Sequence, residues 1–446
     1  MLTTLYWLTQ DLRIDDNPAL MRAAQSDALL CVFCVNQRWF NPHRYHISSM
    51  GSHRWHFLQQ SLDTLSDTLE VQGQHLYIEY GYPEQQLIGL IARHKINRLV
   101  CSRQFGSDER KVLKLLAERF PKLDIEEVDA TTLYDQTQLP MTPLQLLKGF
   151  TPFRKQAEQL PVPPPAQAPM SLPRPVLRAV SIQATPEWIP GSYRRPAASQ
   201  AQRSIAAIGG GERAGKDHLR RYFESTLPSS YKQVRDQLDG WENSSKLSPW
   251  LNFGCLSLRR VAQTLSQYEK THGSNESTQW LFFELLWREY YQWLALAQGD
   301  KLYSIKGISN KPQHGCLHPE RYQKWCHGNT PWPLVNACMR QLKETGYLSN
   351  RGRQIAASCF VNELGMDWRY GAAWFEHQLI DYDVAVNWGN WQYIAGVGVD
   401  PRGGRHFDIE KQTALYDPHG TYIERWAPDA PEPVLDSVDA ADWPIA

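Results

Sequence analysis

Short apolar runs alternate with amphipathic segments along the first 135 residues. The runs are rich in Leu, Val, Ile, Tyr and Cys, as buried strands are, and lie at residues 2–8, 28–35, 75–81, 98–105 and 122–130. The segments between them repeat apolar residues at helical spacing over 50–70, 83–94 and 107–120. Because strands that alternate with helices form parallel sheets, we expect an α/β, Rossmann-like domain over residues 1–135.

The turn after the first strand differs from that of a dinucleotide-binding domain. Its sequence at 9–20, TQDLRIDDNPAL, contains no glycine. A pyrophosphate therefore has no glycine-rich cradle at this point, and the domain is expected to be Rossmann-like in shape only.

The pattern changes twice after residue 135. Between 136 and 202 the periodicity fades and thirteen of the 29 prolines occur, including PVPPP at 161–165, which predicts a long connector on the surface. From 203 to 446 the pattern is helical, with clear helices predicted at 277–299, 333–347, 350–365 and 370–381. The second half is expected to be an all-α domain.

Composition limits the class of protein. With 446 residues two domains are expected, and a net charge of zero means that nucleic-acid binding would need a local basic patch. No apolar run reaches the length of a membrane span and no secretory leader is visible, so we expect a cytoplasmic protein without a membrane partner. The eight cysteines suit buried thiols and show no metal spacing; Cys31 and Cys34 lie in one strand, where residues three apart face opposite sides.

The segment from Asn350 to Tyr393 combines arginines, aspartates and tryptophans in a way unlike an ordinary helical core. Arg353 could pair with Asp381 or Asp383, and the amide of Asn387 could hydrogen-bond a flat heteroaromatic ligand. Trp391 follows closely enough to stack on such a ligand or to supply an electron. These residues favour a flavin site.

Several long motifs carry a resemblance to a known family. They are GGERAGKDHLRRYF at 210–223, SSYKQVRDQL at 229–238, SSKLSPWLNFGCLSLR at 244–259, FELLWREY at 283–290 and DPRGGRHFDIEKQTALYDP at 400–418. In this order they closely resemble the photolyase/cryptochrome family, and specifically its cryptochrome-DASH branch. The resemblance extends from the N-terminal domain to about Trp426.

The resemblance implies FAD bound within the helical domain, with no metal. The residues matching the family's cofactor site are Tyr231, Ser244, Ser245, Lys246, Leu247, Ser248, Glu284, Arg288, Asn350, Arg353, Asp381, Asp383 and Asn387. Plainer interpretations stay open for some of them. The serines could simply cap the helix that begins near Pro249, Glu284 and Arg288 could form a surface pair, and Arg353 with Asp381 could be a structural ion pair.

The resemblance also implies light-driven repair of cyclobutane pyrimidine dimers, the activity of a deoxyribodipyrimidine photolyase. Glu284 matches the carboxyl that contacts the dimer, Trp287 and Tyr393 would line its pocket, and Gln354 would stand at the rim. Conventional photolyases carry Met and Trp where Gln354 and Tyr393 stand, so the grip on a flipped lesion should be weaker. We therefore expect single-stranded DNA as the chief partner, with RNA or duplex DNA bound weakly, by a monomer. Candidate phosphate contacts are Arg213, Arg220, Arg221, Arg402 and Arg405.

Trp391 and Trp368 match the inner members of the family's electron chain, and Asn387 suits a protein that holds the reduced flavin anion. Where the third, exit tryptophan is expected the sequence reads QHGC at 313–316, which leaves Trp325 or Trp332 as substitutes. The family's second chromophore is 5,10-methenyltetrahydrofolate. The acid expected to hold it is replaced here by Gln104, so the sequence leaves folate binding open.

Two other functions remain as alternatives. A cryptochrome blue-light photoreceptor could bind nucleic acid without efficient repair; such proteins usually add a long C-terminal tail, whereas about twenty residues follow Trp426, and Glu284 and Asn387 also favour repair. A light-independent flavin oxidoreductase would need a nicotinamide-binding motif, and none is visible.

Overall fold

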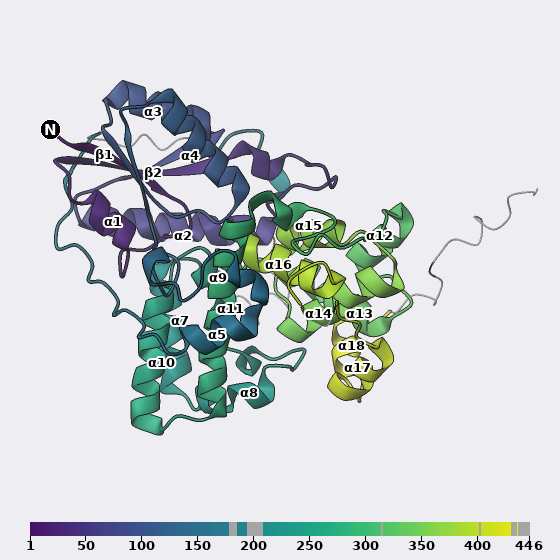
Figure 1. Cartoon of the computed structure of the whole chain (residues 1–446). Coiled ribbons are helices and arrows are strands. Elements are labelled where there is room, and N and C mark those ends of the chain that lie inside the picture. Colours follow the sequence, from purple (N-terminus) through teal and green to yellow (C-terminus); the bar gives the residue numbers. More distant parts are fainter. Residues whose placement is uncertain (178–184, 194–207, 314, 401–402, 430–434, 436–446) are drawn as a thin grey trace, which may run out of the picture.

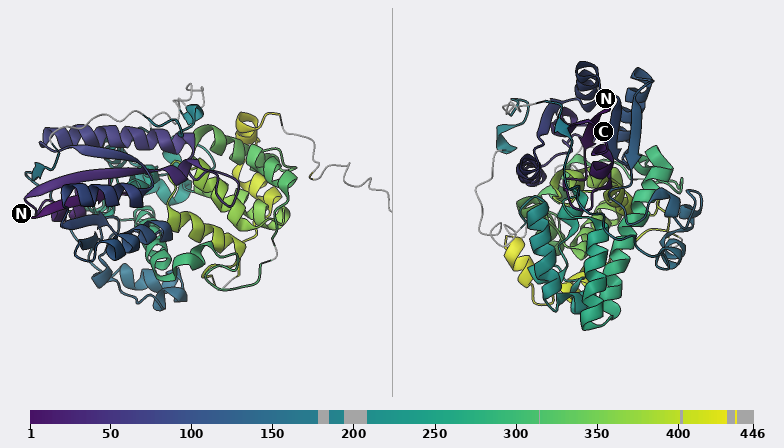
Figure 2. Two further views of the ribbon diagram at one scale, coloured as in Figure 1. Left: turned by 90° about the horizontal axis from the view of Figure 1, so that it is seen from above. Right: turned by 90° about the vertical axis from the view of Figure 1, so that its left-hand side faces the viewer.

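The computed structural model describes residues 1–177, 185–193, 208–313, 315–400, 403–429 and 435. Figure 1 shows a sheet with its helices at the N-terminal end and a larger helical body that follows it. From above, the two parts lie side by side (Figure 2). The α/β domain, the helical domain and the intervening connector are therefore confirmed, while the predicted boundary at 202/203 lies outside the described residues.

The sheet of the N-terminal domain is parallel, with the strand order β3-β2-β1-β4-β5. Its strands are β1 (Thr3–Leu8), β2 (Ala28–Asn36), β3 (Leu76–Gly81), β4 (Arg98–Ser102) and β5 (Asp124–Val128). All five fall within or next to the predicted runs, and the central strands β1 and β2 are buried almost throughout because their runs are apolar on both faces.

Helices cover both faces of this sheet. On one face α1 (Pro18–Ala23) and α2 (Ser52–Val71) share a hydrophobic cluster with Cys31, and on the other face α3 (Pro83–His94) and α4 (Ser107–Arg119) share one with Cys34. The two cysteines thus face opposite sides of the sheet, as the strand geometry predicts. Only the first cluster continues into the helical domain, where it reaches Trp426.

The C-terminal domain contains helices whose amphipathic or apolar faces pack on one another. They are α7 (Glu212–Glu224), α8 (Tyr231–Val234), α9 (Ser248–Asn252), α10 (Leu258–His272), α11 (Glu276–Gln298), α12 (Pro319–His327), α13 (Pro333–Thr345), α14 (Asn350–Ser358), α15 (Trp368–Gln378), α16 (Val384–Ala395), α17 (Ile409–Tyr416) and α18 (Thr421–Trp426). The helix predicted at 350–365 is divided, because α14 passes into a π-helical turn over Cys359–Glu363.

The connector is more deeply integrated than its proline content suggests. It contains α5 (Phe150–Ala157), whose Phe153 is fully buried and which packs on α11, and a short strand β6 (Arg174–Pro175) that pairs with the start of β2. Its apolar residues, which are too few to show a period, anchor it at separate points.

The glycine-free turn after β1 joins the two domains. The guanidinium of Arg13 is buried and donates to the carbonyl oxygens of Ala130 at 2.6 Å and Gly254 at 2.9 Å. Asp15 pairs with Arg260 at 2.7 Å and Asp16 with Arg259 at 3.2 Å. This turn binds the helical domain where a dinucleotide-binding domain would hold a pyrophosphate.

None of the described helices is long and apolar enough to cross a membrane. Within the same residues, no group of three or more His, Cys, Asp or Glu side chains could hold a metal ion.

Candidate functional site

Arg353 pairs with Asp381, the first of the two aspartates that the sequence offered. Its terminal nitrogen lies 2.8 and 2.9 Å from the two carboxylate oxygens of Asp381, which is 5 % exposed. The hydroxyl of Ser248 donates to the same carboxylate at 2.6 Å. Three donated hydrogen bonds offset the desolvation of this buried anion and fix the direction of the guanidinium.

A second ion pair lies on the adjoining side. Arg288 of α11 contacts Asp383 at 3.3 Å and donates to the carbonyl of Thr131 at 2.7 Å. Asn252 connects the pairs, since it hydrogen-bonds the carbonyl of Asp381 and accepts from Arg288 at 3.4 Å. Arg288 therefore belongs to a buried network, and the surface pair with Glu284 considered above does not form.

Lys246 presents a buried positive charge. It is 7 % exposed, adopts φ +52°, and donates to Ser244 Oγ at 2.8 Å and to the Gly240 carbonyl at 3.2 Å. Its ammonium lies 4.9 Å from the ring centroid of Tyr347, and the guanidinium of Arg353 lies over the same ring at 5.6 Å. Within the described residues Lys246 has no carboxylate partner, so the site fits the phosphate groups of FAD.

The other predicted cofactor residues surround this region in different ways. Tyr231 begins α8 and is buried, and burial raises the pKa of its phenol. The carbonyl of Ser245 accepts from His218 at 2.7 Å, and Leu247 is buried just before α9. Asn350 begins α14 and is exposed. Their contact with a cofactor remains a prediction.

Glu284 lies near Tyr231, with a basic partner that the sequence did not suggest. Arg235 contacts its carboxylate at 2.8 Å, and the indole N–H of Trp280 donates to it at 2.9 Å. The side chain is enclosed on most sides yet 33 % exposed, so it faces an opening. Burial raises the pKa of Glu284, while Arg235 and Trp280 act in the opposite direction.

Trp287 and Tyr393 line one small cavity together with Tyr291. The ring of Trp287 stacks on Phe150 of the connector, with centroids 3.6 Å apart and an angle of 13° between planes. Arg405 donates to the Tyr393 hydroxyl at 2.8 Å and lies over its ring. Two of the predicted pocket residues, Trp287 and Tyr393, are thus brought together, whereas Gln354 lies partly buried on α14 and does not line this cavity.

The side chains expected to move electrons lie on α15 and α16. Asn387 donates from its amide to the carbonyl of Ala372 at 3.0 Å. Trp391 is one helical turn further along α16, and its ring lies against Gly371, three residues after Trp368. Both indoles are buried.

Neither substitute for the exit tryptophan is well placed. Trp325 packs on Trp391 at 6.2 Å but is fully buried, and the described rings include none in contact with Trp332. At the expected position, Gly315 lies so close to the Met366 carbonyl that a Cβ would meet it at 2.5 Å. His314 lies outside the described residues.

Gln104 does not replace the folate-binding acid in any direct way. It is 3 % exposed, and its amide donates to Thr9 Oγ1 at 2.6 Å and to the Ser102 carbonyl at 2.7 Å. The donors are therefore used inside the α/β domain, and this side chain offers no charge to a pterin.

The candidate DNA-contacting arginines form two groups. Arg213, Arg220 and Arg221 are exposed on α7, and Arg220 pairs locally with Asp217 at 3.1 Å. Arg405 is held by Tyr393 and Asp400. Arg402 lies outside the described residues.

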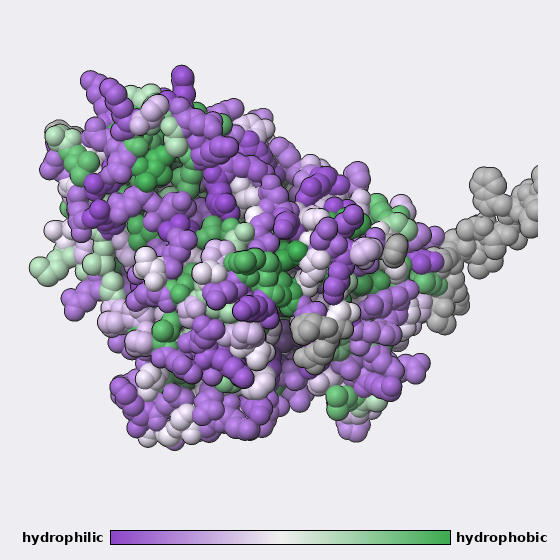
Figure 3. Space-filling view, viewed as in Figure 1, coloured by the Kyte–Doolittle hydropathy of each residue, from purple (hydrophilic) through white to green (hydrophobic). Residues whose placement is uncertain are grey.

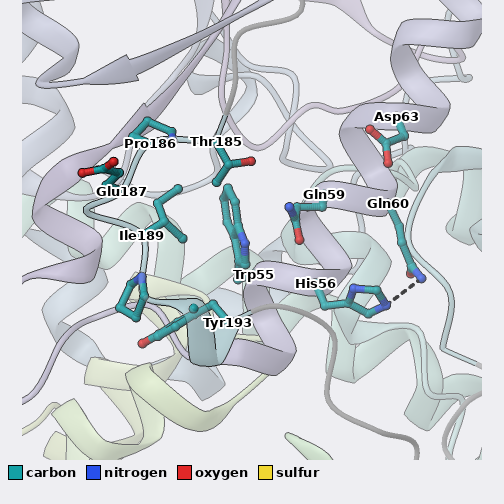
Figure 4. Close-up of a pocket in the computed structure, with 12 residues that line it drawn as sticks. Trp55, His56, Gln59, Gln60, Asp63, Thr185, Pro186, Glu187, Ile189 and Tyr193 are labelled. Atoms are coloured by element: carbon teal, nitrogen blue, oxygen red, sulfur yellow. Dashed lines mark hydrogen bonds between the residues drawn. The ribbon is translucent and has the colours of Figure 1, made fainter.

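A wider cavity of about 710 Å³ lies away from these groups, between α2 and residues 185–193. Figure 4 shows Trp55, His56 and Gln59 of α2 on one side and Ile189 and Tyr193 on the other. Its described lining includes none of the predicted site residues. The space-filling view shows a mostly hydrophilic face with a hydrophobic patch near its centre and a recess beside it (Figure 3).

Comparison with family models and known proteins decides the family. A model described as the FAD binding domain of DNA photolyase matches residues 280–439, and one described as DNA photolyase matches 4–170. Cryptochrome DASH of Idiomarina loihiensis is 47 % identical over 448 residues, covering 99 % of this chain and 96 % of that protein. The chain belongs to the cryptochrome DASH family. Cryptochrome DASH of Synechocystis is 39 % identical, covering 96 % of this chain and 88 % of that protein.

Solved structures agree with this cryptochrome DASH assignment. The Synechocystis cryptochrome superposes with a TM-score of 0.90 at 37 % identity, covering 96 % of this chain and 89 % of that one. A class III photolyase from Agrobacterium tumefaciens gives 0.78 at 25 % identity, covering 96 % and 87 %. The helical domain is thus an FAD-binding domain of the photolyase type.

Sequence reasoning missed several residues of this cryptochrome DASH site, namely Arg235, Asn252, Tyr347, Phe150 and Gln292, whose amide donates to the Asp383 carboxylate at 2.9 Å. Arg235 follows Tyr231 at the i, i+4 spacing within YKQVRDQL, which is a usable signal. Phe150 lies in the connector, where no periodicity marked it.

Proposed function

We propose that this protein is a blue-light-driven, FAD-dependent enzyme that repairs cyclobutane pyrimidine dimers, chiefly in single-stranded DNA. Reduced FAD bound in the helical domain supplies one electron on excitation, which splits the dimer and is then returned. The protein contributes position and electrostatics.

One observation carries the proposal, the placement of Glu284. Its carboxyl faces an opening on α11, and Trp287 lies one turn further along the same helix. Burial raises the pKa of Glu284, so a larger fraction is protonated than for a solvated glutamate. A protonated carboxyl can donate a hydrogen bond to a dimer carbonyl as negative charge develops there.

The cofactor side of the site supports the same chemistry. Arg353, fixed by Asp381, offers a positive charge that would stabilise a reduced flavin anion bound beside it. Asn387 uses its amide nitrogen on Ala372, which leaves the amide oxygen as an acceptor for an N–H group. Lys246 supplies the charge for the FAD phosphates.

The nucleic-acid partner follows from the pocket walls. Trp287, Tyr291 and Tyr393 give the proposed pocket an aromatic lining, and because the faces of the Trp287 ring are already stacked on Phe150 and Tyr291, unpaired bases would pack against the edges of these rings. A duplex lesion must first be unpaired, which costs a few kcal/mol, and Gln354 offers no apolar compensation at the rim. Duplex DNA is therefore the weaker partner, and weak binding of RNA is part of the same proposal. We propose a cytoplasmic monomer, and the eight free thiols suit a reducing compartment.

A folate antenna would have to bind without Gln104, whose donors are used internally. Gln104 does not fit an acid-held pterin, and the proposed repair needs no chromophore besides FAD.

The test uses full-length protein carrying chemically reduced FAD and dimer-bearing oligo(dT) under blue light. We expect dimer loss above the dark control, and a decrease of about tenfold or more for Glu284→Ala with FAD still bound. Glu276→Ala is the matched control, because Glu276 lies on the same helix but on the surface with Lys232. Absence of light-dependent dimer loss in the unmodified protein would favour a photoreceptor instead.

A further inference from the structure

Trp388 packs against Trp368, one of the two inner tryptophans. Its ring centroid is 5.8 Å from that of Trp368, at an angle of 75°, and it is one helical turn before Trp391 on α16. Trp388 is 3 % exposed. Electrons move readily between aromatic rings in contact, so an indole here can exchange an electron with Trp368.

The indole nitrogen of Trp388 has an acidic partner. Its N–H lies 3.3 Å from the carboxylate of Glu376 and 3.2 Å from the hydroxyl of Tyr382. Trp368 and Trp325 instead donate to backbone carbonyls, at 3.1 and 3.0 Å. An indole that loses an electron becomes strongly acidic at N–H, and a carboxylate accepts that proton far more readily than a carbonyl does.

We propose that Trp388 is the third electron carrier of this protein, in place of the missing exit tryptophan, and that Glu376 takes up its indole proton. The inference rests on the proposed flavin function, since the electrons are drawn by bound FAD.

One electron leaves Trp391 for photoexcited oxidised FAD. Trp368 then reduces the oxidised Trp391, and Trp388 reduces the oxidised Trp368, so that the positive charge ends on Trp388. The N–H proton of oxidised Trp388 passes to Glu376, which leaves a neutral indole radical and a carboxylic acid. A thiolate in solution, itself oxidised to a thiyl radical, returns one electron by way of Tyr303, and the proton goes back to the indole. Tyr303 suits this role because it is partly exposed and its ring is 5.0 Å from Trp388.

The surroundings of Glu376 suit a proton acceptor. Burial raises its pKa, which makes the carboxylate a stronger base, and the nearby guanidinium of Arg54 acts in the opposite direction. The titratable or charged groups that face Glu376 from the packed elements are Arg54, Tyr382, Tyr303 and Glu109. Among the described residues Glu376 has no ion-pair partner within 4.0 Å, so it can gain a proton without breaking a salt bridge.

Flash spectroscopy of full-length protein loaded with oxidised FAD tests the assignment. We expect the unmodified protein to form a long-lived, deprotonated tryptophan radical. Trp388→Phe should shorten the lifetime of the charge-separated state about tenfold or more, with FAD content and visible spectrum unchanged. Trp325→Phe is the matched control, because this buried indole also touches Trp391. Equal lifetimes in Trp388→Phe and unmodified protein, or loss in Trp325→Phe alone, would overturn the inference.

Glu376→Gln provides an independent measurement that a purely structural role would not affect. The amide cannot accept the proton, so the radical should remain in its protonated form, which absorbs differently, and Glu376→Asp should restore deprotonation. Unchanged deprotonation in Glu376→Gln would refute the role of Glu376. If Trp388→Phe fails to retain FAD, Glu376→Gln decides the question.

The two proposals can fail separately. Dimer splitting is measured on unmodified protein reduced chemically, which needs no tryptophan chain. Loss of dimers without any long-lived protein radical on flash excitation would overturn this inference and leave the repair function standing, and the reverse result would refute repair alone.

Discussion

The guanidinium of Arg235 lies 2.8 Å from the carboxylate of Glu284. Glu284 is the side chain on which dimer recognition is proposed to depend, and Arg235 is the positive charge that opposes the effect of burial on its pKa. Arg235 also lies over the ring of Trp280, 5.3 Å from its centroid, which holds the guanidinium in place. The protonation of Glu284 therefore depends on its burial and on two groups that oppose it, Arg235 just after α8 and Trp280 on its own helix.

Replacement of Arg235 by Gln should raise the pKa of Glu284 further, because the opposite charge is removed. If the protonated carboxyl donates to the dimer, the rate of dimer splitting falls as the pH rises through the pKa of Glu284. In the variant this fall should occur at higher pH. The measurement is the pH profile of dimer splitting by chemically reduced protein. Lys232→Gln, which removes a nearby exposed charge, should leave the midpoint in place; a limb that moves to lower pH in Arg235→Gln would contradict the assignment.

Lys246→Met should weaken FAD binding about tenfold or more, because the phosphate of FAD loses its charge-assisted contact with the buried ammonium. Titration of the FAD-free protein with FAD measures the effect. Riboflavin, which lacks phosphates, should bind both proteins equally, and Lys232→Met should bind FAD normally. An equal loss for riboflavin would show that Lys246 supports the fold of the site and not the phosphates.

Ionisation of Glu109 should make the free energy of unfolding depend on pH. Burial raises its pKa to about 6. Below the unfolded pKa, about 4.5, the acid is protonated in both states; as the pH rises to about 6 the unfolded chain loses its proton first, so the stability contributed by this group falls. Glu109→Gln should therefore be more stable than the unmodified protein at pH 7.5, by about 1 kcal/mol because the side chain is only partly buried.

Urea unfolding at several pH values checks this prediction. The difference between Glu109→Gln and the unmodified protein should shrink toward pH 4.5. Asp108→Asn is the control, because the neighbouring Asp108 is 85 % exposed and should show no comparable trend. A stability difference that is constant with pH would mean that Glu109 does not change its protonation on folding.

The sequence predicted the sheet and the long helices well, because apolar spacing reports burial directly. The helix predicted at 83–94 has the bounds of α3, and β2 extends only one residue beyond its predicted run. The π-helical turn after Ser358 could not be predicted from the sequence, because its residues continue the helical pattern. Phe153 shows why the connector was harder, as a few buried anchors among prolines have no period.

The site was predictable only in part. Arg353 and Asp381 could be paired from their chemistry, but the choice between two aspartates needed the fold. Trp388 was visible in the sequence beside Asn387, yet its value depends on Trp368 and Glu376, which another helix supplies. Contacts between elements distant in sequence are set by packing, which no local pattern encodes.

Gly254 connects the domain junction to the flavin site, and its substitution should be severe. It has φ +68°, and a Cβ would overlap the carbonyl of Gln10 in the turn after β1. Gly254→Ala should therefore lower the free energy of unfolding by about 3–5 kcal/mol, because the turn can yield only by moving its backbone. Gly273→Ala shares the positive φ, +86°, but has nothing within 4 Å of its Cβ, and should lose only about 1 kcal/mol.

Urea unfolding of the two glycine variants separates the cost of a positive φ, which both share, from the cost of the Cβ overlap with Gln10, which only Gly254→Ala has. Because the carbonyl of Gly254 accepts from the buried Arg13, displacement of this residue also breaks a contact between the domains. Asn252, two residues earlier, links the Asp381 and Arg288 ion pairs, so Gly254→Ala should weaken FAD binding while Gly273→Ala should not. Equal losses of stability in both variants would mean that the turn adapts freely, and that the junction does not hold the flavin site in its observed arrangement.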